Sequence, residues 1–156
     1  MGADFGQWFS EITAQEYWEK MKVQSEAAVQ YLKEQGCTQL GVLGFCWGCM
    51  AAERLASTGH FESAASCYGI HNNTDGYKAA IQAGCDKLLY VSAAGDEFFS
   101  DVTVEALKQD GATVEVKEGV YHGYVLRGDF DNNLEIKKAA DDTMGLISSH
   151  FIGVSA

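Results

Sequence analysis

Residues 40–48 read Leu-Gly-Val-Leu-Gly-Phe-Cys-Trp-Gly. The apolar first half of this stretch belongs to a run at residues 39–45 that predicts a short buried strand, and a helix is predicted directly afterwards, at about residues 47–57. Between them stands Gly-x-Cys-x-Gly, a pattern typical of a sharp turn from a strand into a helix. Such a turn exposes its middle residue at the C-terminal end of a parallel sheet. We therefore expect an α/β fold, with Cys46 as a candidate nucleophile.

The glycine-flanked cysteine has other interpretations, and the pentapeptide alone leaves them open. Glycine-rich turns also bind phosphate, although the usual G-x-G-x-x-G pattern is missing here. Single cysteines most often fill space in the core. Cys46 and Cys49 form a C-x-x-C pair that would suit a redox site. For a nucleophile turn, we expect both Gly44 and Gly48 to be required, because a side chain at either would collide with backbone as the chain reverses.

Strands and helices alternate along the rest of the chain. Further strands are predicted at residues 64–70, 87–93 and 113–117, and further helices at residues 13–35, 77–83, 102–109 and 134–151. Thr13 and Glu16 are predicted to begin the first of these helices as a capping box. Because strands joined through helices pair in parallel, about four parallel strands with helices on both faces are expected. They form a single domain over residues 13–156, after an N-terminal extension over residues 1–12.

Two polar residues follow the ends of predicted strands. Asp96 comes just after the strand at residues 87–93, and His122 lies in the loop after the strand at residues 113–117. The C-terminal ends of parallel strands share one edge of the sheet, where ligand sites of such folds gather. Taken separately, Asp96 is more typical of a turn and His122 of a loop. Together with Cys46 they follow the chain order nucleophile, acid, histidine.

This order predicts a catalytic triad. Cys46 would attack a carbonyl carbon as a thiolate, and His122 would accept the thiol proton and later return it to the leaving group. Asp96 would hold the other imidazole nitrogen and fix its tautomer. The backbone N–H of Trp47 would be an oxyanion donor, since it follows the nucleophile. Three other histidines compete as the base without following a predicted strand in this order: His60, His71 and His150.

Composition limits the partners. The formal net charge is −11, so nucleic acid and anionic membrane surfaces would repel the chain, and an anionic substrate would need a local cation. No apolar run approaches the ~20 residues of a membrane span, and no basic residue precedes Lys20 as a targeting segment would require. The five cysteines are an odd number without paired metal-ligand spacing. We therefore expect reduced thiols in the cytoplasm or an organelle, and neither a metal nor another cofactor.

The motifs together resemble the dienelactone hydrolase family, from about residue 20 to the end of the chain. The resemblance rests on the residues at 44–48, 95–96, 121–124 and 127. It implies an α/β-hydrolase fold, without a cofactor, that cleaves a lactone or small ester. Position by position, it implies that Cys46, Asp96 and His122 are nucleophile, acid and base. It further implies that Arg127 and Tyr124 bind the substrate, and that Arg127 does so by pairing with a carboxylate of the substrate.

The chain departs from the family pattern before the candidate nucleophile. Family members carry a longer N-terminal region whose strands flank the one that leads into the nucleophile turn. That region supplies a second oxyanion donor, another arginine and a glutamate, none of which can be placed here. The strand at residues 40–45 is then expected at an edge of a truncated sheet. The unpaired backbone groups of an exposed apolar edge strand tend to pair with another strand or chain. We expect a homodimer or a protein partner, through this edge or through the helix at residues 13–35.

Two functions from different classes remain open at this point. The complete set of Cys46, Asp96 and His122 favours a hydrolase with a cysteine nucleophile. The missing strands favour a catalytically impaired hydrolase-fold protein that serves as a structural or interaction subunit of a larger complex.

Overall fold

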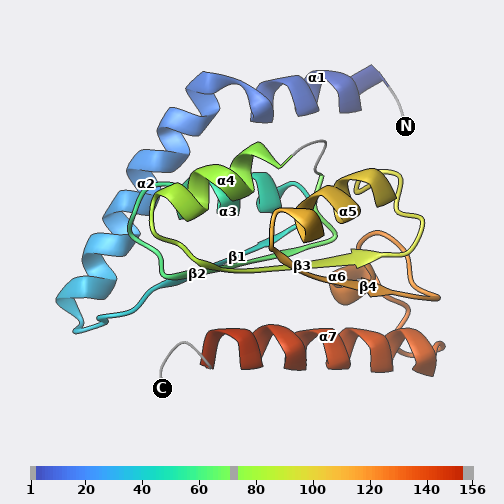
Figure 1. Cartoon of the computed structure of the whole chain (residues 1–156). Coiled ribbons are helices and arrows are strands. Elements are labelled where there is room, and N and C mark those ends of the chain that lie inside the picture. Colours follow the sequence, from blue (N-terminus) through green and yellow to red (C-terminus); the bar gives the residue numbers. More distant parts are fainter. Residues whose placement is uncertain (1–2, 71–73, 153–156) are drawn as a thin grey trace. The chain divides into compact units, whose positions relative to one another are not determined.

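The computed structural model describes residues 3–70 and 74–152, in two compact units, Met1–Thr38 and Gln39–Ala156. In the first unit, α1 spans Ala3–Thr13 and α2 spans Gln15–Glu34 (Figure 1). The expected capping box is wrong. Ala14 is the N-cap of α2 and makes no side-chain cap, while the Thr13 hydroxyl donates to the Phe9 carbonyl, 2.8 Å away in α1. Thr13 thus ends one helix instead of beginning the next, since its hydroxyl bonds back along the chain.

The second unit contains a four-stranded parallel sheet, as the sequence predicts, and its strand order is β1-β2-β3-β4. The strands are β1 (Gly41–Phe45), β2 (Ser63–Cys67), β3 (Lys87–Ala93) and β4 (Thr113–Lys117). The helices are α3 (Gly48–Ala56), α4 (Asp75–Gln82), α5 (Asp101–Gln109), α6 (Tyr124–Arg127) and α7 (Leu134–Ile152). Among these five helices, only the short α6 was not expected; in the first unit, α1 was not expected either, since the first helix was predicted to begin at residue 13. Among the described residues, no helix combines the length and the apolar character needed to cross a membrane.

The sheet is buried between two helical layers, and β3, one of its two central strands, is apolar on both faces. In β3, Leu88 and Tyr90 pack into the core beneath α3, α4 and α5, whereas Leu89 and Val91 pack into the core beside α6 and α7. Figure 1 shows α3, α4 and α5 on one side of the sheet and α7 on the other. Period-two alternation along one strand therefore fills two cores, and it fixes the register that brings the strand ends together.

The two edge strands differ in charge. In β4, Glu115 and Lys117 pair at 3.0 Å, so the edge carries the charged side chains that discourage pairing with another chain. The strand β1 has no charged residue, and Leu43 is 37% exposed. Among the described residues, no strand pairs with the outer edge of β1.

Candidate active site

The turn after β1 holds Cys46 in a left-handed backbone conformation, with φ 54°. Its N–H donates to the Cys67 carbonyl at the end of β2 (3.1 Å), which fixes the turn to the sheet. A side chain at Gly44 would meet the backbone of the following helix, since its Cβ would lie 2.7 Å from the Cα of Cys49. A Cβ at Gly48 would meet nothing within 4 Å. The expectation that both glycines are sterically required is therefore correct for Gly44 and wrong for Gly48, whose α-carbon faces open space.

The structure brings three of the predicted residues into one chain of contacts. The Nε2 of His122 lies 3.1 Å from the Sγ of Cys46, and its Nδ1 lies 2.9 Å from the Oδ2 of Asp96. The carboxylate is fully buried, and the imidazole is 16% exposed. The other oxygen of Asp96 accepts a hydrogen bond from the Phe98 N–H (3.0 Å). Because the carboxylate can only accept, Nδ1 carries the proton and Nε2 is free to accept the thiol proton.

Two aromatic rings contact the imidazole of His122. The ring of Phe98 makes an edge contact with His122, at 5.0 Å between centroids, and the ring of Tyr68 makes another at 5.3 Å. Sequence reasoning missed both residues. Tyr68 follows β2 directly, whereas the strand was predicted to run to residue 70 and so to include Tyr68. An earlier predicted end of that strand would have placed Tyr68 at the same edge of the sheet as Cys46.

Arg127 stands close to the candidate base. Gly123, at φ 90°, begins α6, and a Cβ there would lie 2.5 Å from the Arg127 Nη2, so the guanidinium packs on the backbone beside His122. The Arg127 residue is exposed to solvent. Tyr124, by contrast, is fully buried, and its hydroxyl lies 2.6 Å from the Thr143 hydroxyl on α7. The substrate-binding role expected for Tyr124 stays a prediction, and its hydrogen bond within the core favours packing.

Trp47, the predicted oxyanion residue, is the N-cap of α3, in helical conformation with φ −55° and ψ −35°. Its backbone N–H therefore lies where the partial positive charge of a helix N-terminus is concentrated. That position suits a donor to a developing oxyanion at the neighbouring Cys46.

Three of the other four cysteines face the core. Burial raises the pKa of the Cys67 thiol to about 12 and that of the Cys85 thiol to about 11. Burial, and then the neighbouring Cys67, holds the pKa of Cys49 well above its usual range. The Cys49 thiol is also used, since it donates to the carbonyls of Gly44 (3.1 Å) and Cys67 (3.3 Å). These contacts favour a structural Cys49 over a redox partner.

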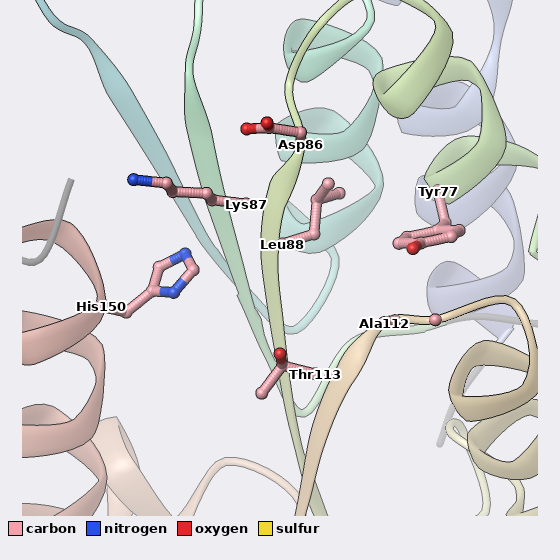
Figure 2. A pocket seen from close by; sticks show the side chains of 8 residues that line it. Tyr77, Asp86, Lys87, Leu88, Ala112, Thr113 and His150 are labelled. Carbon is pink, nitrogen blue, oxygen red and sulfur yellow. The ribbon is translucent and has the colours of Figure 1, made fainter.

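A cavity of about 210 Å³ lies at the opposite end of the sheet from Cys46, where β3 and β4 begin. Figure 2 shows His150 and Tyr77 on opposite sides of β3 in this cavity. The Nε2 of His150 lies 3.1 Å from the Ala64 carbonyl, and burial lowers the pKa of the imidazole. His150 is therefore bound into the core, away from the candidate nucleophile. His71 lies outside the described residues.

No group of three or more metal-ligating side chains converges within the described ranges 3–70 and 74–152.

Comparison with known proteins places these features in context. A sequence model described as the dienelactone hydrolase family matches residues 2–151. The structure is similar to the crystal structure of a dienelactone hydrolase-like promiscuous phosphotriesterase from metagenomic libraries, with a TM-score of 0.51 and 18% sequence identity. That similarity covers 70% of this chain and 51% of the other, so the chain spans about half the length of that protein. No curated protein matches the sequence.

Proposed function

Because the chain belongs to the dienelactone hydrolase family, we propose that it hydrolyses a lactone or small ester through a Cys46 nucleophile. The observation that carries the proposal is the continuous contact from the Cys46 thiol through His122 to Asp96, at 3.1 and 2.9 Å. Both contacts are short enough to pass a proton without rearrangement of the free chain. The protein with the similar structure is described as a phosphotriesterase, so phosphotriesters are a second substrate class to test.

The reaction proceeds in two halves. His122 takes the thiol proton through Nε2, and the thiolate of Cys46 adds to the substrate carbonyl. The negative oxygen that forms accepts a hydrogen bond from the Trp47 N–H, and the tetrahedral intermediate collapses as His122 returns the proton to the leaving alkoxide. In the second half, His122 deprotonates a water that attacks the thioester. The Cys46 thiolate leaves and takes back the proton from His122, and the acid product is released.

Acylation by an activated ester tests the proposal. After brief incubation with p-nitrophenyl acetate, peptide mass spectrometry should find the acetyl group on Cys46 ahead of every other thiol. The informative competitor is Cys37, which is exposed but lacks a neighbouring base among the described contacts, whereas the other three thiols are buried. Acetylation of Cys37 at the same rate or faster would show that Cys46 is not activated.

Arg127 is predicted to select substrates that carry a carboxylate, because its planar guanidinium offers two parallel donors. Arg127→Ala should lower kcat/KM for a carboxylated ester or lactone by about 10- to 100-fold, since a charge-assisted bidentate pair is lost. The neutral ester of the same alcohol is the matched control substrate, and it should change by less than about threefold. Arg127→Lys keeps the charge and should restore only part of the loss. Equal losses on both substrates would assign the arginine to packing over Gly123.

We also propose a protein interface at the outer edge of β1. The apolar character of this edge is the observation that favours a structural or interaction role. The edge is apolar and uncharged, whereas the opposite edge strand carries an ion pair. A second copy or another protein that pairs there would satisfy the outward backbone groups. This role does not compete with catalysis, since Cys46 lies beyond the end of the strand.

Sedimentation at micromolar concentration checks the interface. The chain should sediment as an assembly, and Leu43→Lys should return it to a monomer because a charge discourages edge pairing. Thr113→Lys places the same charge on the other edge strand and should leave the assembly intact. If Leu43→Lys leaves the assembly intact, the interface would be assigned to α2 instead of β1. If the wild-type chain sediments as a monomer, both proposed interfaces would be contradicted.

A further inference from the structure

Two non-glycine residues in the described part of the chain have positive φ, Cys46 at 54° and Tyr68 at 43°. They are neighbours in space, because β1 and β2 are in register from Phe45 to Cys67 and each residue follows directly. Side chains rarely adopt this backbone conformation, and where they do the strain is usually tied to a functional position. The strain at Cys46 belongs to the nucleophile turn. The strain at Tyr68 has no such explanation in the fold.

The Tyr68 hydroxyl is also unusual in its hydrogen bonding. The residue is 1% exposed, and its hydroxyl oxygen has no hydrogen-bond partner among the described residues. Three other buried tyrosines in the second unit all have a partner for the hydroxyl: Tyr77 (Asp110 carbonyl), Tyr90 (Glu53) and Tyr124 (Thr143). A buried hydroxyl without a partner destabilises the folded chain, whereas phenylalanine would fill the same space without that penalty. A ligand atom that pairs with this oxygen would remove the penalty.

The surroundings of Tyr68 place it within the candidate active site. Its ring lies 5.3 Å from the ring of His122 and 5.8 Å from that of Phe45, the residue before the nucleophile. Burial, followed by the thiols around it, including that of Cys46, raises the pKa of the phenol, and the positive charge of Arg127 acts in the opposite direction. The hydroxyl therefore keeps its proton across the working pH range, so it can donate a hydrogen bond but cannot serve as a base.

We propose that the Tyr68 hydroxyl donates a hydrogen bond to an oxygen of the acyl group held at Cys46, which makes Tyr68 a further substrate-binding residue. The inference rests on the proposed hydrolase function and deepens it. In the free chain the donor is buried and unpaired, and it gains its partner only when the substrate or the tetrahedral intermediate is bound. An interaction that exists only in the bound states contributes to kcat/KM in full.

The substitution Tyr68→Phe removes the hydroxyl alone and should change activity and stability in opposite directions. On a neutral activated ester, which needs no help from Arg127, kcat/KM should fall by about 10- to 100-fold. The melting temperature should rise by about 2–4 °C, because an unpaired buried oxygen is removed and no hydrogen bond is lost.

Tyr77→Phe is the matched control. Its hydroxyl donates to the Asp110 carbonyl (3.2 Å) in the cavity of Figure 2, at the other end of the sheet. This variant should lose stability and keep its kcat/KM. For Tyr68→Phe, an unchanged kcat/KM would overturn the proposal. So would a lower melting temperature, which would show that the hydroxyl is paired in the free chain.

A second measurement separates this inference from the hydrolase function. If the wild-type chain shows no hydrolysis that depends on Cys46, the proposed function fails, but the Tyr68 donor can still be tested with a stable adduct. In a Cys37→Ser background, iodoacetamide places an amide carbonyl on Cys46, since the remaining thiols are buried. The adduct should raise the melting temperature more in the chain with Tyr68 than in Tyr68→Phe. Equal shifts in both would refute the contact.

Discussion

Cys46→Ala is expected to lower kcat for ester hydrolysis by about 10⁴-fold or more, because the substitution removes the atom that forms the thioester. Binding and the Trp47 oxyanion donor would remain, so a residual rate above background is expected. The fold should survive, since alanine is smaller than cysteine at this half-buried position and its Cβ adds no strain to the left-handed backbone that cysteine already adopts. Initial rates with a saturating neutral ester, together with thermal unfolding of both proteins, measure the two quantities separately.

Cysteine controls make that result specific. Cys37→Ala removes an exposed thiol from the first unit and should leave kcat unchanged. Cys46→Ser keeps a nucleophile of similar size but a much less acidic one, and it should retain only a small part of the rate. A Cys46→Ala protein that hydrolyses the ester within about tenfold of the wild type would eliminate the thioester mechanism.

Asp96→Asn is expected to lower kcat by about 10⁴-fold while leaving the fold nearly unchanged. The amide oxygen can still accept from the Phe98 N–H, which the carboxylate does at 3.0 Å. The amide nitrogen, however, would donate to Nδ1 of His122, where the carboxylate now accepts at 2.9 Å. The proton would then sit on Nε2 and face the Cys46 thiol, so the imidazole could no longer take the thiol proton.

The tautomer explanation has its own measurement. Imidazole nitrogen chemical shifts of His122 should report a proton on Nδ1 in the wild type and on Nε2 in Asp96→Asn. Asp110→Asn is the control, since that exposed carboxylate pairs with Lys78 (3.1 Å) at the far end of the sheet and should not affect kcat. An Asp96→Asn protein that keeps more than a tenth of the wild-type kcat would assign the carboxylate to structure alone.

Several elements were predictable because their signals are local. The strands β3 and β4 begin and end at the residues that the sequence predicted, since apolar runs and alternation at period two need no information from distant residues. The capping box at Thr13 failed because a hydroxyl can bond back into the preceding turn as well as forward. The helix α6 was missed because its four residues, Tyr124–Arg127, are too few to show a helical period.

The family, the parallel α/β sheet and the chain order of Cys46, Asp96 and His122 could all be predicted from the amino-acid sequence. These predictions depend on turn residues and on hydrophobic periodicity, both of which can be recognised within short stretches of consecutive residues. The three-dimensional packing was needed to show that the three side chains lie within contact distance and that Gly48 has room for a side chain. It was also needed to show that Tyr68 has a strained backbone and a buried hydroxyl without a partner among the described residues. These features could not be predicted because they arise from contacts between residues that are far apart in the sequence. The pairing of β1 with β2 brings these groups together, and a run of consecutive residues does not show which strand will lie beside which.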